Sequence, residues 1–344
     1  MKTVTLGSTG IACVQNGFGA LPIQRADEHT AVKILRKAYD GGMRFFDTAR
    51  AYSDSEHKIS LAFFNGYVNR EDIIITTKTM AKNPEDFKKD LETSLKTLNV
   101  DYIDVYQFHC ANTVYRPNDG SGMYEEMLKA KEEGKIRHIG ITAHKVGVAK
   151  EAIESGLYET LQFPLSYLSA DKDLELVKMC KEHNMGFIAM KGLAGGLINK
   201  STPAMAFMTQ FDNVMPIWGV QKEKEIDEWL EFMDNTPELD EETKAFIEKE
   251  KEELSGDFCR GCGYCMPCPM GIKINNCARM IQMIRRAPSA NWLSEANQAE
   301  MMKIETCLHC GQCASKCPYE LNTPELLEKN YEDYKKVISG EIKL

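Results

Sequence analysis

The cysteines in the last third of the chain have a spacing suited to metal chemistry. Nine of the twelve cysteines lie between Cys259 and Cys317. Eight of them fall in two runs, CRGCGYCMPCP (259–269) and CLHCGQCASKCP (307–318), where three cysteines spaced by two residues precede a fourth that is followed by proline. A single C-x2-C pair fits zinc equally well, but paired triplets with a trailing Cys-Pro are typical of iron–sulfur ligation. We therefore expect iron–sulfur clusters in this region rather than zinc.

The second run resembles the bacterial ferredoxin run, and the first is one residue short before its last cysteine. In ferredoxins the triplet binds one [4Fe–4S] cluster, and the fourth thiolate, turned away by the proline, binds the other. The resemblance therefore implies two [4Fe–4S] clusters, with Cys259, Cys262, Cys265 and Cys317 on the first and Cys268, Cys307, Cys310 and Cys313 on the second. Cys13, Cys110, Cys180 and Cys277 are interpreted as small buried apolar residues.

A second group of reactive side chains lies far upstream, around FFDTARAY (45–52). Asp47 ends a predicted strand, Tyr52 lies in the loop after it, and Lys78 and His109 end the next two predicted strands. A neighbouring ammonium lowers the pKa of a phenol, which suits the phenol to acid–base work. Each residue alone could be structural, as a helix cap, a rim aromatic, a solvated loop end or a core histidine. All four together at the ends of three neighbouring strands favour a catalytic site.

The elements that position these residues repeat one pattern, in which a β-branched or aromatic run precedes an amphipathic helical stretch. The predicted strands are 14–20, 44–49, 72–78, 102–109, 136–142, 160–167, 186–191 and 214–219. Strands separated by helices pair in parallel, and eight such units have the size of a (β/α)8 TIM barrel. A doubly wound open sheet is the competing fold, but its G-x-G-x-x-G fingerprint is absent from the first unit. The sequence thus predicts an α/β barrel.

The change in cysteine content marks a domain boundary. We predict a barrel over residues 1–235, a connecting helix over the charged segment 236–256, and a dicluster ferredoxin-like domain over 257–344 that ends in a helix. Segments 274–287 and 294–306 both have helical patterns, so this small domain is expected to be mainly helical.

The barrel resembles the aldo-keto reductases, since FDTARAY matches their D-T-A-x-x-Y, TTK their lysine strand and QFH their histidine strand. The resemblance implies that Tyr52 donates a proton to a carbonyl oxygen, with Lys78 as the cation beside it and Asp47 holding Lys78. It implies that His109 orients the substrate oxygen. The dinucleotide would be bound by Thr142, Gln162, Met190, Lys191, Leu193, Gly195, Gly219, Val220, Gln221, Lys222 and Glu228.

Three departures from the family pattern bear on the dinucleotide. Ala143 stands where many members carry an asparagine, and Glu225 stands where a basic residue often meets the 2′-phosphate. The segment after MKGLAGG (190–196) is also short. The resemblance indicates NADP(H) rather than NAD(H), while these departures leave NAD(H) open and point to weakened binding.

Composition excludes several other classes of function. The net charge of −9 argues against a nucleic-acid partner, and no run of about 18 apolar residues exists that could cross a membrane. The first residues lack the pattern of a secretory signal, so we expect a cytoplasmic protein, in which cysteines serve metals or catalysis rather than disulfides.

Barrels with a carboxy-terminal dicluster domain form a recognised group that this chain resembles from end to end, and three readings of it remain. In the first, NAD(P)H reduces a small-molecule carbonyl compound, or the alcohol is oxidised, while the clusters are structural or regulatory. In the second, the clusters carry electrons between the barrel and a ferredoxin-like partner. In the third, the barrel is idle and the protein is a redox-sensing or binding module. The substrate pocket is expected to include Gln24, Arg25, Tyr115, Arg116 and Asp119.

Overall fold

A computed structural model describes the chain except residues 255–257, 262, 287–289, 318 and 344. The chain divides into two compact units. Unit 1 comprises Met1–Gly192 and Ser201–Thr243, and unit 2 comprises Leu193–Lys200 and Lys244–Leu344. The short segment 193–200 therefore belongs to the same unit as the cysteine runs, although it lies within the barrel sequence.

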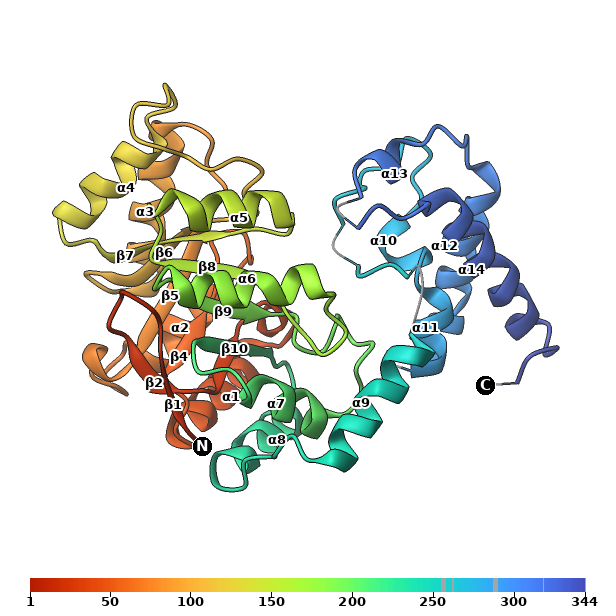
Figure 1. Cartoon of the computed structure of the whole chain (residues 1–344), viewed down its shortest axis with the longest axis horizontal. Coiled ribbons are helices and arrows are strands. Elements are labelled where there is room, and N and C mark those ends of the chain that lie inside the picture. Colours follow the sequence, from red (N-terminus) through yellow and green to blue (C-terminus); the bar gives the residue numbers. More distant parts are fainter. Residues whose placement is uncertain (255–257, 262, 287–289, 318, 344) are drawn as a thin grey trace. The chain divides into compact units, whose positions relative to one another are not determined.

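Unit 1 is built around a closed parallel barrel, which confirms the predicted fold (Figure 1). Its strands are β3 (Gly17–Gly19), β4 (Phe45–Asp47), β5 (Ile74–Thr79), β6 (Ile103–Phe108), β7 (Ile136–Thr142), β8 (Thr160–Pro164), β9 (Gly186–Met190) and β10 (Val214–Gly219). They follow one another in chain order, and β10 closes the barrel by pairing with β3. Each strand lies within one of the eight predicted runs, except that β5 extends one residue further, to Thr79.

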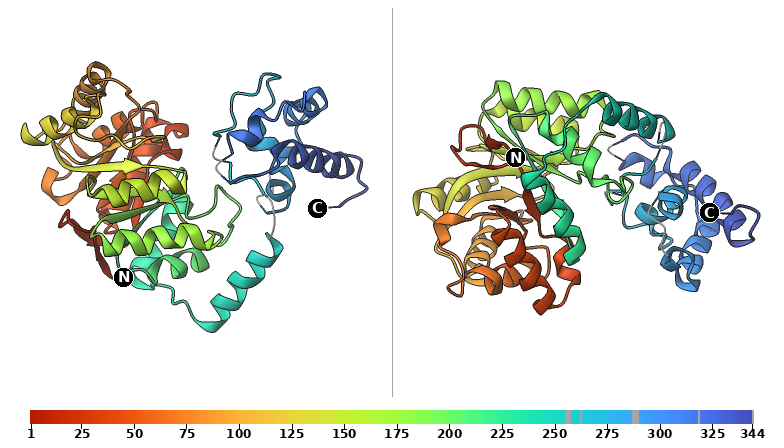
Figure 2. Two further views of the ribbon diagram at one scale, coloured as in Figure 1. Left: turned by 45° about the horizontal axis from the view of Figure 1, so that its top comes forward. Right: turned by 90° about the horizontal axis from the view of Figure 1, so that it is seen from below.

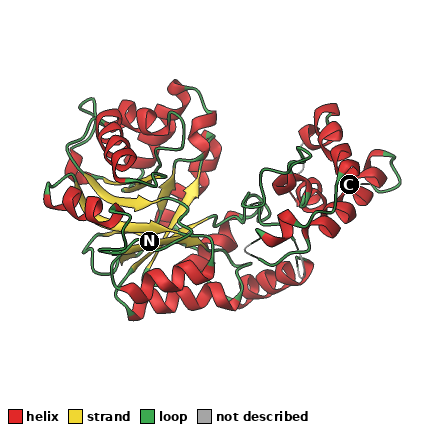
Figure 3. Cartoon of the chain, turned by 90° about the horizontal axis from the view of Figure 1, so that it is seen from above, coloured by secondary structure: helices red, strands yellow, loops and turns green. Residues whose placement is uncertain are grey.

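A helix follows each barrel strand, and Figure 3 shows helices enclosing the strands of this unit. These helices are α1 (Glu28–Asp40), α2 (Ser55–Phe63), α3 (Pro84–Leu98), α4 (Met123–Glu132), α5 (Val146–Ser155), α6 (Asp171–Glu182), α7 (Ser201–Thr209) and α8 (Glu223–Asp234). Local chemistry sets their starts: the Asp27 side chain accepts from the Thr30 amide, and Asn83 caps α3 just before Pro84.

An antiparallel hairpin precedes the barrel. Its strands are β1 (Thr3–Thr5) and β2 (Ala12–Val14). Val4 and Leu6 pack with Phe45, Ile188 and Met215, which lie on three different barrel strands. The hairpin thus closes one end of the barrel with apolar side chains.

Strand register brings the predicted site residues to the opposite, carboxyl-terminal end. Asp47 lies level with Thr76 on β5, and Lys78 lies level with Gln107 on β6. Thr142 lies level with Gln162. Since side chains two apart on a strand share a face, Thr76 with Lys78 and Gln107 with His109 point to the same side of their strands.

Unit 2 is helical. It contains α9 (Glu241–Glu253), which begins in unit 1 and is turquoise in Figure 2. The helices drawn in blue there follow it: α10 (Ile274–Cys277), α11 (Met280–Arg286), α12 (Glu295–Met302), α13 (Gln312–Ser315) and α14 (Thr323–Ile338). Short 3-10 turns, η3 (Ala290–Leu293) and η4 (Lys303–Thr306), flank α12. The helix expected over 274–287 is broken between Cys277 and Met280. None of the described helices is both long and apolar enough to span a bilayer.

Candidate functional site

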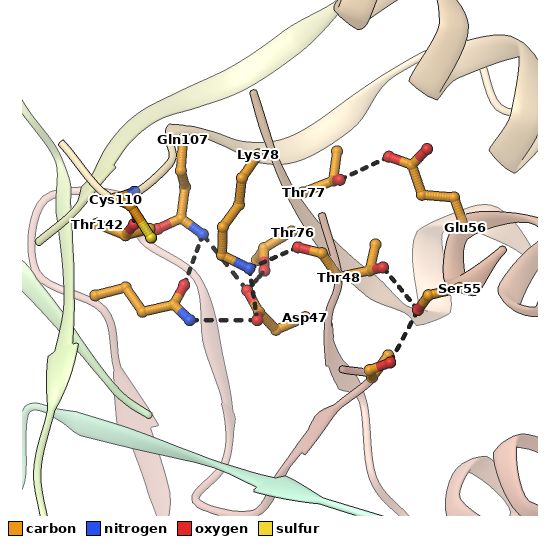
Figure 4. Close-up of polar contacts among 12 residues, drawn as sticks. Asp47, Thr48, Ser55, Glu56, Thr76, Thr77, Lys78, Gln107, Cys110 and Thr142 are labelled. Carbon is orange, nitrogen blue, oxygen red and sulfur yellow. Dashed lines mark hydrogen bonds and ion pairs between the residues drawn. The ribbon is translucent and has the colours of Figure 1, made fainter. Parts of the chain in front are cut away.

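A buried ion pair lies at the centre of the candidate active site. Lys78 Nζ donates to Asp47 Oδ2 at 2.7 Å and to the Thr48 carbonyl at 2.6 Å, as Figure 4 shows. Both side chains are almost fully buried. Burial lowers the pKa of Lys78, whereas the Asp47 carboxylate acts in the opposite direction and favours the charged amine. The structure thus brings together the two residues that the sequence pairs.

Three further polar side chains hold Asp47. Thr76 Oγ1 donates to its Oδ1 at 2.6 Å, and Gln162 Nε2 donates to its Oδ2 at 3.3 Å. Gln107 Nε2 donates to Gln162 Oε1 at 2.9 Å. Sequence reasoning named Gln162 for the dinucleotide but missed Thr76 and Gln107. The alternation of side chains along a strand predicts both, because Thr76 points to the same side as Lys78, and Gln107 to the same side as His109.

Tyr52 lies beside Lys78 and His109. Lys78 Nζ is 5.2 Å from the centroid of the Tyr52 ring, and the Tyr52 and His109 rings meet edge to face with centroids 5.6 Å apart. Burial raises the pKa of Tyr52 above its ordinary value, and the charges of Asp47 and Cys110 add to this effect. The direction is opposite to the one expected from a neighbouring ammonium alone, because burial outweighs that effect and the Asp47 charge adds to the burial.

His109 directly follows β6 and stays neutral at neutral pH. Burial lowers the pKa of His109 to about 3, and the charges of Lys78 and His144 act in the same direction. Within the described part of the chain, its Nδ1 is buried without a hydrogen-bond partner. A neutral imidazole has one N–H that can donate to a substrate oxygen. Cys110, which follows it, has a left-handed backbone (φ 51°), and its amide donates to Thr142 Oγ1 at 2.7 Å.

The dinucleotide candidates of β10 and α8 lie at the start of the last barrel helix. Gly219 ends β10, Val220 is buried, and Lys222 stands at the helix cap, while Glu228 is exposed further along the helix. The Gln221 and Lys222 amides donate to Glu225 Oε2 at 2.8 and 3.1 Å. These two amides, expected to meet phosphate, are therefore capped by a carboxylate of their own helix.

The candidates after β9 fall into both units. Met190 ends the strand, and Lys191 follows with a left-handed backbone (φ 59°) in unit 1. Leu193 and Gly195 belong to unit 2. The Leu193 carbonyl accepts from the Gly196 and Ile198 amides at 2.9 and 3.2 Å, which folds this segment into a tight turn.

Most of the residues expected around the substrate have side-chain or backbone partners within the barrel. Arg116 Nη2 pairs with Glu151 at 3.0 Å, and the Arg116 amide donates to Asp119 at 2.9 Å. Gln24 accepts from Ser53 at 3.1 Å, and Arg25 ends a short 3-10 turn, η1 (Pro22–Arg25). Tyr115 packs on Phe108, with ring centroids 4.7 Å apart.

One hollow of unit 2 is lined by five cysteines, with proline, isoleucine and leucine side chains between them. The cysteines are Cys265, Cys268, Cys307, Cys310 and Cys313. Four of these are the thiols that the sequence assigns to the second cluster. Thiols on an apolar wall suit an iron–sulfur cluster, which binds through thiolate and is tuned by its shielding from water.

A second hollow is lined by Cys259, Cys265 and Cys317, together with Arg260 and Tyr319. These three cysteines are assigned to the first cluster, and their fourth partner, Cys262, lies outside the described residues. Cys265 lines both hollows. Among the described residues no three potential ligands converge as they would around a single ion. The donor set of each hollow fits a cluster, since a cubane binds each thiolate through a different iron atom.

The remaining cysteines include three buried thiols, Cys13, Cys180 and Cys277. Burial raises the pKa of the Cys277 thiol to about 11 and that of Cys13 to about 12, and it raises the pKa of Cys180 as well. Cys110 is only partly buried.

Two family models match the chain. That of the aldo/keto reductase family matches residues 14–212, and that of a 4Fe-4S dicluster domain matches residues 258–322. L-galactose dehydrogenase of Arabidopsis thaliana is 31% identical over 216 residues, which are 58% of this chain and 67% of that protein. The probable aldo-keto reductase 1 of Glycine max is 27% identical over 212 residues, 57% of this chain, and the match spans 60% of its length.

Solved structures share the barrel. An aldo-keto reductase from Bacillus halodurans (holo form) superposes with a TM-score of 0.64 at 22% identity, covering 73% of this chain and 96% of that one. One from Klebsiella pneumoniae in complex with NADPH gives 0.61 at 21% identity, covering 72% and 94%. Together with the matched family models, this likeness in fold leads to one conclusion: the chain belongs to the aldo/keto reductase family and carries a 4Fe-4S dicluster domain.

Proposed function

We propose that the barrel interconverts a small-molecule carbonyl compound and its alcohol, with Tyr52 as the proton donor. The observation that supports this most is the buried Asp47–Lys78 pair beside Tyr52, with the edge of one ring against His109. A nicotinamide dinucleotide, when bound, supplies hydride to the carbonyl carbon. Tyr52 then gives its hydroxyl proton to the carbonyl oxygen, and the proton is replaced from solvent.

The proton stays on Tyr52 until it is needed. Since burial raises the pKa of this phenol, it is protonated at neutral pH, as a donor must be. The phenolate left after transfer is stabilised by the Lys78 ammonium, which Asp47 holds in place. Neutral His109 donates an N–H to the same oxygen and so fixes the direction of proton transfer.

The dinucleotide is proposed to lie across the loops after β9 and β10, on the residues named above from the family resemblance. The NADPH complex of the Klebsiella protein supports NADP(H) for this fold. In this chain Glu225 places a negative charge on the amides that would meet phosphate, so we propose NADP(H) as a weakly held cofactor.

The small unit is proposed to hold two [4Fe–4S] clusters on the eight cysteines of the two runs. The clusters would bind the folded unit and not the unfolded chain, which has no preformed site. Their binding therefore stabilises the folded unit. The alternative, in which they pass electrons to a ferredoxin-like partner, predicts that NADPH bleaches the visible absorption of anaerobic protein. We favour the structural role, because hydride carries two electrons together and a cluster normally accepts one.

The test of the barrel chemistry is Tyr52→Phe, compared with Tyr67→Phe. Tyr67 is exposed and donates to Asp40, away from the site. Turnover in an anaerobic screen of aldehydes and ketones should fall about 100-fold or more in Tyr52→Phe, since general acid catalysis supplies about 10²–10⁴. NADPH affinity should stay at the parental value. Parental turnover in Tyr52→Phe would refute the assignment of the proton donor.

A further inference from the structure

The segment 193–200 continues the chain from the barrel strand β9, yet two arginines of unit 2 hold it. Arg279 Nη1 donates to the Gly195 carbonyl at 3.1 Å, and Arg286 Nε donates to the Leu197 carbonyl at 2.9 Å. Asn199 Nδ2 donates in return to the Arg286 carbonyl at 3.3 Å. Leu197 and Ile198 are buried. The conformation of this segment therefore depends on the unit that carries the cysteines.

Arg279 also contacts the first cysteine run. Its guanidinium lies against two glycines with left-handed backbones, Gly195 (φ 68°) in the segment and Gly261 (φ 66°) between Cys259 and Cys262. A Cβ on Gly195 would lie 2.9 Å from Arg279 Nη1, and a Cβ on Gly261 would lie 2.8 Å from its Cζ. The guanidinium thus fills the space between the run and the segment, and a side chain at either position would have to displace it.

The charge of Arg279 has no carboxylate partner within the described residues. Its Nε is buried and makes no hydrogen bond there. Burial lowers the pKa of Arg279, and the charge of Cys259 acts in the opposite direction. Cys259 is one of the thiols that line the first hollow, and a cluster bound by four thiolates has a negative charge. A bound first cluster would therefore supply the countercharge that this buried cation needs.

We propose that Arg279 is a positioning residue that makes the order of segment 193–200 depend on the first iron–sulfur cluster. The negative charge of the cluster holds the Arg279 guanidinium in place, and the guanidinium holds the Gly195 carbonyl by its hydrogen bond. The segment thereby keeps the conformation described above. The inference rests on the proposed function in one respect, namely that this segment contacts the dinucleotide. Loss of the first cluster then releases the segment and weakens dinucleotide binding.

The test is Arg279→Gln in the full, anaerobically prepared chain, with Arg285→Gln as the matched control. Arg285 lies on α11, the helix that begins directly after Arg279, but its guanidinium pairs with Asp333 at 2.7 Å. Hydrogen exchange of the peptide covering 193–200 should speed up in Arg279→Gln alone. The Kd for NADPH should rise about tenfold, which is the usual effect of losing a hydrogen bond to a charged group. The reduction potential of one cluster should become more negative, because a positive charge that favours the reduced form is gone.

Gly195→Ala tests the same contact from the segment side without touching a cysteine run. Gly156→Ala is its control, since Gly156 has a similar φ of 65° and open space around it. We expect faster exchange over 193–200 and full iron content in Gly195→Ala. Parental exchange in both Arg279→Gln and Gly195→Ala would overturn the inference. A parent chain that binds no NADPH would instead overturn the proposed function, while the exchange comparison would still decide the role of Arg279.

Discussion

Lys78 Nζ and Asp47 Oδ2 lie 2.7 Å apart at the ends of two adjacent strands, and the two side chains are buried together. The ammonium beside Tyr52 is therefore balanced before any ligand binds. Burial raises the pKa of the phenol, so in the proposed reaction Lys78 becomes a partner for the phenolate only once the proton has left.

Replacing Lys78 by methionine should abolish carbonyl turnover and destabilise the barrel. The change leaves Asp47 as a buried carboxylate without its cation, which costs about 3–5 kcal/mol of the free energy of unfolding. The double variant Asp47→Asn/Lys78→Met should recover much of that stability but not the turnover, which we expect about 100-fold or more below the parent. Denaturation followed by circular dichroism, together with turnover, measures both. Full turnover in the double variant would contradict the role of Lys78.

His109 should make the protein lose stability in acid. The pKa of His109 is about 3 in the folded chain, against an ordinary 6.5, so below pH 6.5 the unfolded chain binds a proton that the folded one does not. This loss begins as the pH falls through 6.5 and is complete below about 3. His109→Gln should therefore lose less stability than the parent between about pH 7 and about pH 5. Urea unfolding at both pH values measures it, with the exposed His183→Gln as control. Equal losses in parent and His109→Gln would contradict the buried, neutral imidazole.

Glu225→Gln should tighten the binding of NADPH. The Glu225 carboxylate caps the Gln221 and Lys222 amides, and removing its charge leaves them to phosphate. One charge near a solvated phosphate is worth about 1 kcal/mol, or about fivefold in Kd. Glu223→Gln is the matched control, because Glu223 stands in the same turn but pairs with Lys33 at 2.9 Å. Fluorescence titration with NADPH and NADH compares them, and an unchanged Kd in Glu225→Gln would show that this helix start does not contact the dinucleotide.

The iron content should reveal which cysteines are ligands. Anaerobic protein should contain about eight irons and eight sulfides per chain, four for each cluster. Cys307→Ser should lower the iron content towards about four and should also lower the unfolding temperature of unit 2. Cys277→Ser should keep the full content, since Cys277 is a buried thiol outside both hollows, with its pKa raised to about 11. Zinc as the main metal, or equal iron in all three proteins, would contradict the eight-ligand assignment.

The barrel could be predicted from sequence because each strand has its own apolar run and each helix its own periodicity. The pairing of Asp47 with Lys78 follows from this, since parallel strands bring their carboxyl ends together. The hairpin of β1 and β2 was missed, because three-residue strands carry too little pattern to be recognised.

Other features depend on contacts that no local pattern contains. The Glu225 carboxylate turns back onto the amides of Gln221 and Lys222, and only the side-chain conformation decides that. The high pKa of Tyr52 arises from burial, which a motif does not report. Segment 193–200 belongs to unit 2 through Arg279 and Arg286, which come more than eighty residues later in the chain.

Because segment 193–200 is enclosed by barrel sequence yet folds with the small unit, the boundary between the two units is crossed three times along the chain. A shortened protein that stops after Thr243 would keep this segment but lose Arg279 and Arg286. Its residues Leu197 and Ile198, which are buried in the full chain, would lack residues 244–344 of the unit to which they belong. Conversely, residues 244–344 expressed alone would lack eight residues of their own fold. Transfer of the small unit to another barrel therefore requires two segments, the loop 193–200 that follows β9 and the carboxyl-terminal residues 244–344.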